Sequence, residues 1–568
     1  MPNKVLLVNH IGYEPSSTKK VIFQSRQDLS PEIFCIRNSN DEILYKGKFD
    51  NGGITDHWHT GYAFIGDFSE FRSVGTYHIS CEIEDQQIES NWFRIERNII
   101  QNSCLPLLLG GFQSRHPDKK YEDKDRYLSF FGNRNDLVDV HGGWYDASGD
   151  VSKYLSHLSF ANFMNPQQIP LIVWNMLEVA ETKDYGISKT GFHEELLTEA
   201  CYGADFLVRM QDPDGCFYMT VFDNWTGDPE KREICAYRGQ DGVRSADYQA
   251  GFRQGAGMAI AALAKAGRSG MNGEYSQKQY LQKAVFGFDH LLQHNQEYLD
   301  DKTENIIDDY CFLMAAVELY KTLEDVTYLD HSRTRSQMLI NRLYADSNYS
   351  GWWRADETGI RPFFHASDAG LPLMALCKFL EIETDQHLRE EIILSIQTSL
   401  DFEIEITNEI INPFGYSRQY VRAVDETEPK PSFFMPHRNE TGYWWQGENA
   451  RIASLASGML MAKPYLSNES KKKADMFALD QINWILGLNP YNACMLDGVG
   501  NNNPEYFESV NVNYPGGICN GITSGFKNES DIAFMPLPYN NDPAHQWRWS
   551  EQWIPHAAWF MLAISILK

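Results

Sequence analysis

Residues 141–150 read His141-Gly142-Gly143-Trp144-Tyr145-Asp146-Ala147-Ser148-Gly149-Asp150, and this stretch decides how the rest of the chain is interpreted. Two carboxylates stand four positions apart in a glycine-rich turn. Glycine reaches backbone conformations that other residues adopt only with strain, so such a turn can aim both acids into one cavity. Two acids at one spot suit general-base catalysis on water, because each changes the proton affinity of the other. The alternative is a plain turn whose aspartates cap the following helix.

A further candidate acid lies near the C-terminus, in Gln546-Trp547-Arg548-Trp549-Ser550-Glu551-Gln552-Trp553. Aromatic rings around Glu551 favour the protonated form of its carboxyl group. Hydrolysis of a glycosidic bond with inversion needs such a proton donor across the bond from the base, with room for water between them. The alternative pairs Glu551 with Arg548 beside the start of a helix.

Several other stretches combine aromatic rings with polar side chains, which is how proteins hold a hydroxyl-rich ring. The strongest is residues 437–449, and weaker examples are residues 352–354 and 363–368. A structural interpretation, with the tryptophans in the core and the charges at its rim, remains open. The candidate substrate-binding residues are Tyr145, His437, Arg438, Glu440, Trp444, Trp445, Glu448, Trp352, His365 and Asp368.

Composition and charge favour a globular enzyme of the cytoplasm. The formal net charge of −27 over 568 residues argues against nucleic acid or an anionic membrane as partner. The N-terminus lacks the pattern of a signal peptide, and no run approaches the ~18 apolar residues of a membrane span. Ten scattered cysteines without a CxxC pair indicate reduced thiols. A hydrolase of glycosidic bonds in the cytoplasm would be expected to act on a small imported oligosaccharide.

Short strands separated by turn residues fill the first 98 positions, which predicts an antiparallel β-sandwich. Asn51-Gly52-Gly53 is interpreted as one of the turns. The expected strands are residues 5–8, 20–25, 32–37, 42–45, 62–68, 75–84 and 87–94.

From about residue 105 onward, apolar positions recur at three- and four-residue spacing, which predicts helices. With the segment after Asp150 they number roughly twelve, as a closed barrel of six helical hairpins requires. The predicted domains are therefore a β-sandwich over residues 1–98 and a helical domain over residues 105–568. The expected helices are residues 171–180, 194–210, 246–266, 281–294, 308–323, 331–344, 365–380, 388–404, 450–462, 471–486 and 556–567.

Residues 142–150 resemble the Gly-Gly-Trp-Tyr-Asp-Ala-Gly-Asp signature of glycoside hydrolase family 9. Residues 9–15 resemble the start of the immunoglobulin-like module that precedes many catalytic domains of that family. The resemblance implies an (α/α)6 barrel and an inverting hydrolase. It assigns Asp150 as the catalytic base, Asp146 as the partner that holds the attacking water, and Glu551 as the acid. One departure is Ser148, which lengthens the usual three-residue spacing of the acids by one.

Within that family the chain looks most similar to a signal-less bacterial branch that includes exo-acting β-D-glucosaminidases of chitosan oligosaccharides. The likeness rests on residues 146–150 and 443–449. It implies an acid beside the C2 ammonium of glucosamine, for which Glu448 or Glu440 is the candidate. The alternative within the family is a β-1,4-glucanase or cellobiase. Rivals from other classes are a carbohydrate-binding protein and a helical scaffold, neither of which explains the three acids.

No metal or cofactor is expected. The Cys/His zinc cluster of many family members has only Cys104, His116 and His141 as possible remnants. The family's His-x-Arg element is missing after Asn489-Pro490, which predicts rebuilt subsites near the cleavage point. Residues 346–357 fit the spacing of an EF-hand loop, but they carry aromatic residues and lack evident flanking helices.

Overall fold

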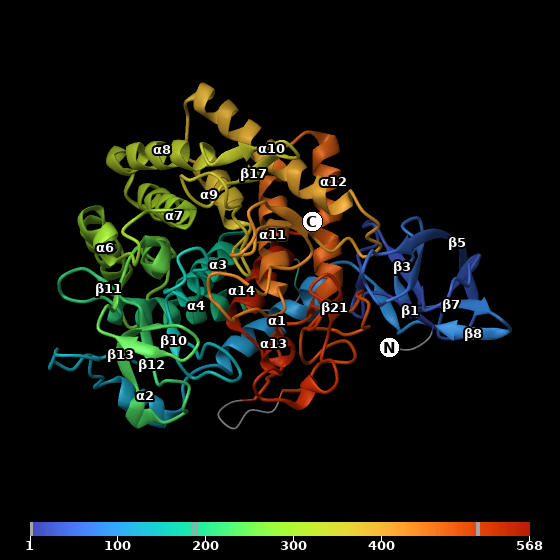
Figure 1. Ribbon diagram of the computed structural model, residues 1–568, viewed down its shortest axis with the longest axis horizontal. Coiled ribbons are helices and arrows are strands. Elements are labelled where there is room, and N and C mark those ends of the chain that lie inside the picture. The colour runs from blue at the N-terminus through green and yellow to red at the C-terminus, as the bar shows by residue number, and fades with distance from the viewer. Residues whose placement is uncertain (1–3, 183–186, 188–190, 507–511, 568) are drawn as a thin grey trace.

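The N-terminal part of the chain is an all-β module. The computed structural model describes residues 4–182, 187, 191–506 and 512–567 (Figure 1). The strands pair in the order β1-β3-β6-β5-β4-β7-β9-β2, with β8 paired to β7, and they enclose an aromatic core that includes Phe23, Phe34 and Phe64. The predicted immunoglobulin-like β-sandwich is confirmed. Its strands are β1 (Lys4–Leu7), β2 (Gly12–Tyr13), β3 (Lys20–Ser25), β4 (Ile33–Arg37), β5 (Ile43–Ile54), β6 (Tyr62–Asp67), β7 (Gly75–Ile83), β8 (Gln86–Glu89) and β9 (Phe93–Ile95).

The interpretation of Asn51-Gly52-Gly53 as a turn is wrong. These residues lie inside the twelve-residue strand β5, where the register against β6 shifts between Asn51 and Gly53. Such a β-bulge places an extra residue opposite the partner strand, and Gly53 accommodates it with a φ of 79°. Glycine in a strand therefore marked a bulge here rather than a strand end.

The remaining chain is mainly helical and forms the predicted (α/α)6 barrel. In the described residues, six inner helices contact one another in a closed ring, α3-α5-α7-α9-α11-α14 and back to α3, and α1, α4, α6, α8, α10 and α12 cover it. The inner helices are α3 (Ile169–Thr182), α5 (Gly257–Ala266), α7 (Ile306–Leu323), α9 (Leu371–Leu380), α11 (Asn449–Ala462) and α14 (Ile554–Ile566). The outer helices are α1 (Ile99–Gln113), α4 (Phe192–Arg209), α6 (Gln277–Tyr298), α8 (Val326–Ile340), α10 (Gln386–Asn408) and α12 (Asn468–Ile485).

Two expectations about the helices are wrong. The twelfth barrel helix is α1, whereas the segment after Asp150 forms turns and the short strand β10 (Lys153–Tyr154). The predicted helix 246–266 begins only at Gly257. Gly255 has a φ of 104°, and this non-helical backbone interrupts the helix. Gly255 also lies so close to Leu155 that a Cβ would come within 2.5 Å of the leucine Cβ.

The β-sandwich lies against one side of the barrel, beside α12 (Figure 1). The residues that resemble the start of an immunoglobulin-like module make this contact: the Asn9 amide donates to Asn483, and the His10 backbone N–H donates to Leu486 O at 2.9 Å. The His10 ring also approaches the Asn492 amide oxygen at 2.8 Å. The expected packing role of this module agrees with these contacts. The expected domain boundaries stay a prediction.

Long connections gather at the N-terminal ends of the inner helices. Five of the six inner helices are preceded by a long connection that carries short strands, whereas α7 follows α6 after residues 299–305 alone. No described helix combines the length and apolar character needed to cross a bilayer. The strands in these segments are β11 (Phe217–Tyr218), β12 (Thr220–Phe222), β13 (Glu233–Arg238), β14 (Val243–Ser245), β15 (Gln249–Ala250), β16 (Leu343–Ala345), β17 (Ser350–Trp353), β18 (Gln419–Val421), β19 (Lys430–Ser432), β20 (Thr523–Ser524) and β21 (Ile532–Ala533).

A buried ion network ties the inner helices together at their C-terminal ends, away from these connections. The Lys265 ammonium on α5 lies 2.7 Å from Glu178 on α3 and 3.7 Å from Glu318 on α7. Lys378 on α9 reaches the other oxygen of Glu178 at 2.9 Å. Burial would raise the pKa of Glu318, but the charges of Lys265 and Arg268 outweigh it and lower this pKa to about 2. Four of the six inner helices are thus joined at this end by buried charges that have no water to replace a lost partner.

We expect Lys265→Met to destabilise the helical domain by about 3–5 kcal/mol, because it removes one of the cations that pair with the buried carboxylates of Glu178 and Glu318. Glu318 has a lowered pKa in the fold, so its contribution is present at neutral pH and lost as the pH falls towards 2. The deficit of the variant should therefore be largest near pH 7 and shrink in acid. Urea unfolding followed by circular dichroism at several pH values measures it.

The matched control is Lys473→Met, which removes an exposed lysine whose partner Glu469 is also exposed. A surface pair of this kind contributes little to stability. Equal loss of stability in the two variants would contradict the importance of the buried network.

Candidate active site

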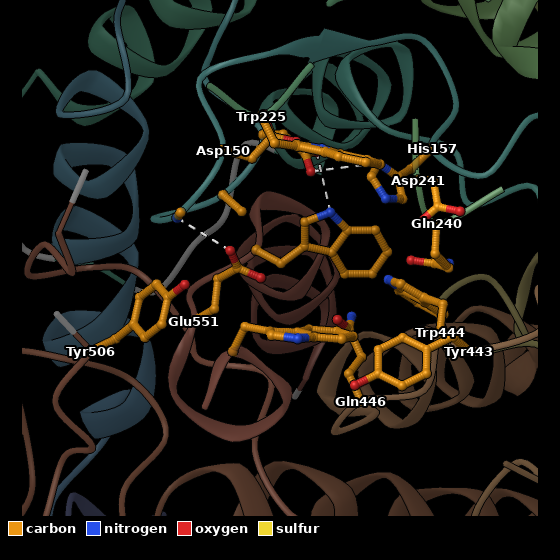
Figure 2. A pocket seen from close by; sticks show the side chains of 15 residues that line it. Asp150, His157, Trp225, Gln240, Asp241, Tyr443, Trp444, Gln446, Tyr506 and Glu551 are labelled. Atoms are coloured by element: carbon orange, nitrogen blue, oxygen red, sulfur yellow. Dashed lines mark hydrogen bonds and ion pairs between the residues drawn. The ribbon is translucent and has the colours of Figure 1, made fainter. Parts of the chain in front are cut away.

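A cavity of about 550 Å³ lies among the connections at the N-terminal ends of the inner helices, and it contains all three predicted catalytic acids. Figure 2 shows Asp150 with Trp225 on one side of it, and Glu551 with Tyr506 across from them. The cavity is lined by Asp146, Ala147, Gly149, Asp150, His157, Trp225, Gln240, Asp241, Tyr443, Trp444, Gln446, Tyr506, Trp547, Glu551 and Trp553.

The turn that carries Asp146 and Asp150 is fixed from behind by a buried charge triad. The Asp125 carboxylate lies 2.7 Å from the Lys153 ammonium and 2.8 Å from Nε of Arg232, and all three side chains are fully buried. Lys153 also donates to the carbonyl oxygens of Val140 and Gly142, and Arg232 donates to that of Val151. The triad thus holds the backbone on both flanks of the turn.

The extra residue of the turn, Ser148, binds the segment that carries Glu551. Its backbone N–H donates to Gln552 O at 2.9 Å, and its hydroxyl accepts from the Gln552 N–H at 2.8 Å. The next residue, Gly149, donates its N–H to Oε1 of Glu551 at 3.2 Å. The added residue therefore joins two segments about 400 positions apart in the sequence.

The carboxylate of Asp150 accepts three hydrogen bonds. The Ser152 backbone N–H binds Oδ1 at 2.8 Å, while the Tyr154 hydroxyl and the Trp225 indole N–H bind Oδ2 at 2.7 Å and 3.1 Å. Burial and the neighbouring charge of Asp223 raise the pKa of Asp150 to about 6, although the donors from Ser152 and Tyr154 oppose the rise. Asp150 is therefore ionised at neutral pH.

Asp146 lies deeper and in a more apolar setting. Burial, followed by the charges of Asp150 and Glu551, raises its pKa well above the ordinary value. The Trp553 indole N–H donates to Oδ1 at 3.2 Å and the Gln168 amide also opposes the rise, while the His157 ring nitrogen stays 3.7 Å from Oδ2. Burial lowers the pKa of His157 to about 3, so this imidazole is neutral and adds no positive charge. Of the two aspartates, Asp146 is therefore the one whose protonated form is more strongly favoured.

The segment of Glu551 is anchored by its neighbour Gln552 and by the buried Arg115. The Gln552 side-chain oxygen accepts from Nη2 of Arg115 at 2.5 Å and from the Tyr514 backbone N–H. The backbone carbonyl of Glu551 accepts from the Asn520 N–H at 2.8 Å. Burial lowers the pKa of Arg115 to about 10, which leaves a cation behind the carboxyl groups at neutral pH.

The side-chain amides of Gln240 and Gln446 line the cavity. The donor nitrogen of each, Nε2, is buried and has no hydrogen-bond partner among the described residues. Aromatic faces surround them: Trp444 lies edge-on to Trp553, with ring centroids 5.9 Å apart. Rings for apolar contact together with unpaired donors are the features by which proteins bind sugar hydroxyls.

The predicted loop 437–449 contributes to the cavity, but most of its candidate residues do not line it. Trp444 does. Trp445 is instead buried between the His437 ring, at a centroid distance of 3.7 Å, and the Arg548 guanidinium, at 3.9 Å. Arg438 is exposed and pairs with Asp425, and Glu440 pairs with Arg361. These side chains therefore support the loop instead of facing the cavity.

The remaining candidates are also placed outside the cavity lining. Glu448 is fully buried against the Arg451 guanidinium at the start of α11. The Tyr145 hydroxyl accepts from the Asp118 N–H, and Trp352 packs with Phe402 and Tyr420 in a separate aromatic cluster. His365 and Asp368 lie in the barrel interior, where Asp368 accepts from Gln167 N–H and from the Trp559 indole. Sequence alone does not separate the residues that line the cavity from those buried elsewhere, because buried aromatic–polar clusters and binding loops have similar composition.

Sequence reasoning missed most of the wall. Trp547 and Trp553 flank Glu551 and could have been found from that proximity. Trp225, Gln240 and Asp241 come from the connections on either side of β13, which carry no distinctive motif. His157 follows the signature by seven residues and was passed over because the segment after Asp150 was interpreted as helix.

The possible metal sites are occupied by ordinary contacts. Cys104 is buried in the core, His116 pairs with Glu199 at 2.7 Å, and His141 pairs with Asp139. In the EF-hand-like loop, Glu357 pairs with Arg342. Among the described residues one acid-and-thiol group, Asp212, Asp214 and Cys216, is close enough to hold an ion, but Asp212 already binds Arg134 and Tyr218.

Comparison with known proteins gives two family models. The model described as "Glycosyl hydrolase family 9" matches residues 111–516, and "Cellulase N-terminal ig-like domain" matches residues 2–86. Two solved structures with the same fold are a metagenome-derived glycoside hydrolase family 9 endoglucanase and a Bacteroides ovatus GH9 protein. They have TM-scores of 0.68 and 0.67 and identities of 16% and 18%. The alignments cover 99% and 100% of this chain, and 98% and 99% of those chains.

Two curated relatives share 24% and 20% of their aligned residues with this chain. A Butyrivibrio fibrisolvens cellodextrinase is 24% identical over 60% of this chain, and an Acetivibrio thermocellus endoglucanase D is 20% identical over 88%. The aligned region spans 62% of the cellodextrinase and 73% of the endoglucanase. This chain thus corresponds to less than two thirds of the first of these relatives.

We expect Gly149→Ala to lower kcat by about 10²-fold, the cost of displacing a reacting group by a fraction of an ångström to 1 Å. A Cβ there would lie 2.6 Å from Oε1 of Glu551 and 2.7 Å from the Tyr506 hydroxyl. Gly149 has no left-handed φ, so the substitution adds no backbone strain. Initial rates on an oligosaccharide measure the effect.

Gly110→Ala is the control, because Gly110 lies inside α1 and a Cβ there meets nothing within 4 Å. Alanine favours a helix over glycine by up to ~1 kcal/mol, so this variant should keep its rate and gain slight stability. Normal turnover by Gly149→Ala would show that the close approach of Gly149 and Glu551 is not needed.

Proposed function

The chain belongs to glycosyl hydrolase family 9, and from this premise we propose that it hydrolyses β-1,4-linked oligosaccharides of glucose with inversion at the anomeric carbon. The observation that carries the proposal is the gathering of Asp146, Asp150 and Glu551 in one aromatic-walled cavity. The printed names of the relatives, cellodextrinase and endoglucanase, support glucose oligosaccharides over the glucosamine substrate expected from the motifs.

In the proposed reaction Asp150 is the general base. It is the aspartate with three hydrogen-bond donors and therefore the ionised one, so it can take a proton from a water molecule. Asp146, protonated and 2% exposed, has an O–H with which to orient that water. The hydroxide equivalent then attacks the anomeric carbon from the Asp150 side.

Glu551 is the proposed general acid. It lies across the cavity from Asp150 (Figure 2), where it would protonate the departing glycosidic oxygen while the bond breaks. Inverting enzymes place the acid and the base on opposite sides of the scissile bond and leave room for water between them. Trp444, Trp547 and Trp553 supply ring faces against which the sugar can pack.

We expect Glu551→Gln to reduce kcat on cello-oligosaccharides by about 10²–10⁴-fold, the usual worth of a general acid. The same variant should retain much more activity on a dinitrophenyl glycoside, whose leaving group departs without a proton. Asp150→Asn should be inactive on both, because attack by water still needs a base. Proton NMR of the first product should show the α-anomer from a β-linked substrate. A β-anomer, or equal losses on both substrates for the two variants, would contradict the assignment.

A second candidate is an exo-acting β-D-glucosaminidase, and the charge of the cavity favours it. Its lining contains four carboxyl groups, those of Asp146, Asp150, Asp241 and Glu551, and none of the described lining residues is Lys or Arg. An acid-lined cavity attracts a cation such as the ammonium of glucosamine. Asp241 replaces Glu440 and Glu448 as the acid for this role, because those two are paired with Arg361 and Arg451 outside the cavity.

Hydrolysis of cellobiose and of the glucosamine disaccharide, measured side by side, decides between the two substrates. If glucose oligosaccharides are the substrate, we expect the higher kcat/KM on cellobiose, with little change in Asp241→Asn. A preference for the amino sugar that Asp241→Asn reduces about tenfold or more would establish the second candidate instead. If the protein cleaves neither disaccharide and no longer oligomer of glucose or glucosamine, both candidates are contradicted.

A further inference from the structure

The indole of Trp225 touches the proposed base directly, although it stands on a different element. It lies in the connection between β12 and β13, and its N–H donates to Oδ2 of Asp150 at 3.1 Å. The Tyr154 hydroxyl binds the same oxygen at 2.7 Å. Two neutral donors on one oxygen leave the other oxygen, Oδ1, with one donor, the Ser152 N–H. The base is therefore oriented by these side chains and not by the turn alone.

The connection that presents Trp225 is shaped for this contact. Asn224 and Trp225 both have left-handed φ values, 61° and 54°, a conformation that costs energy in residues other than glycine. Asp223 stabilises it by accepting from the N–H groups of Trp225 and Gly227. A Cβ on Gly242 would lie 2.8 Å from the indole ring, so the neighbouring turn must stay bare of side chain there.

The same carboxylate of Asp223 also acts on the base through its charge. It accepts from the Ser152 hydroxyl at 3.0 Å, which brings it next to the Asp150 backbone segment, and its charge raises the pKa of Asp150. The hydrogen-bond donors thus lower the pKa of Asp150, whereas the charge of Asp223 raises it. The titratable or charged groups around Asp150 are Asp146, Asp223, Arg232, Asp241, Tyr154, His157, Tyr237 and Glu551.

We propose that Trp225 and Tyr154 are positioning residues that select Asp150, and not Asp146, as the ionised member of the aspartate pair. The inference rests on the proposed function, in which Asp150 is the base. Each donor stabilises the carboxylate over the carboxylic acid. Asp150 accepts three hydrogen bonds, one of them at 2.7 Å, whereas the donors toward Asp146 are the Trp553 indole at 3.2 Å and the Gln168 amide. The choice of base is then made by side chains on β10 and on the β12–β13 connection.

Removing one donor should raise the proton affinity of Asp150. In Trp225→Phe the ring remains but the N–H is lost, so we expect the acidic limb of the kcat/KM profile to move to higher pH by about half to one unit. Tyr154→Phe should move it in the same direction, and the double variant further. Asp223→Asn removes a like charge and should move the limb to lower pH. KM should change less than kcat in all of them.

Trp547→Phe is the matched control, since Trp547 also lines the cavity but donates its indole N–H to the Ala544 carbonyl. It should lower the rate without moving the limb. Equal rate losses in Trp225→Phe and Trp547→Phe, with both limbs unmoved, would overturn the proposal and leave Trp225 as a ring for sugar contact.

An infrared titration of the carboxylate band, assigned by its loss in Asp150→Asn, reads the proton affinity of Asp150 without turnover. It separates the two failures. If the wild-type chain cleaves no glycoside, the proposed function fails, while a shifted band in Trp225→Phe still supports the control of Asp150 by Trp225. An unshifted band overturns that control whatever the substrate.

Discussion

The two aspartates of one buried turn both have raised pKa values, and much of the structure around them bears on which of the two is ionised. Burial raises the pKa of both, with the charges of Asp150 and Glu551 adding to it at Asp146 and that of Asp223 at Asp150. Asp150 accepts three hydrogen bonds, whereas the donors toward Asp146 are the Trp553 indole and the Gln168 amide. The pair is therefore asymmetric before any substrate binds. A base must be ionised and a water-orienting acid must be neutral, so the asymmetry supplies both forms at the same pH.

The asymmetry depends on holding the turn rigidly, and buried charge does this. Asp125, Lys153 and Arg232 form a triad without solvent contact that binds backbone carbonyls on each flank of the turn. A triad of this kind tolerates the loss of no member, since water cannot replace the missing charge. The second ion network, around Lys265 and Glu178, joins four inner helices at the far end of the ring. Buried charge thus supports both the turn beside the cavity and the opposite ends of four inner helices.

The cavity combines two signals about substrate. Its aromatic walls and unpaired amide donors suit a neutral sugar, whereas its four carboxyl groups suit a cationic one. The inserted Ser148 belongs to this question, because it binds the Glu551 segment and so fixes how closely acid and base segments approach. One added residue in the turn thus affects how the segments that carry Asp150 and Glu551 lie relative to each other. Small displacements of reacting groups have large effects on rate.

The sequence by itself determined most of the elements and the three acids that line the cavity. Apolar spacing of three and four residues located eleven of the helices to within five positions, apart from α5 and α9, which begin eleven and six residues later than expected. Short alternating runs located the sandwich, because these periods record which face each element buries. The signature at 141–150 and the aromatic setting of Glu551 identified side chains that the fold brings into one cavity.

Only the tertiary structure decided which other residues join them. Trp225, Gln240 and Asp241 reach the cavity from strand connections, and Glu448, His365 and Asp368 are consumed by buried partners, because contacts between distant segments leave no periodic trace in sequence. Pairing with β6 likewise made Asn51-Gly52-Gly53 a bulge inside β5, and the twelfth barrel helix lies before the signature. The protonation of the two aspartates is tertiary for the same reason: it depends on donors that arrive from other elements.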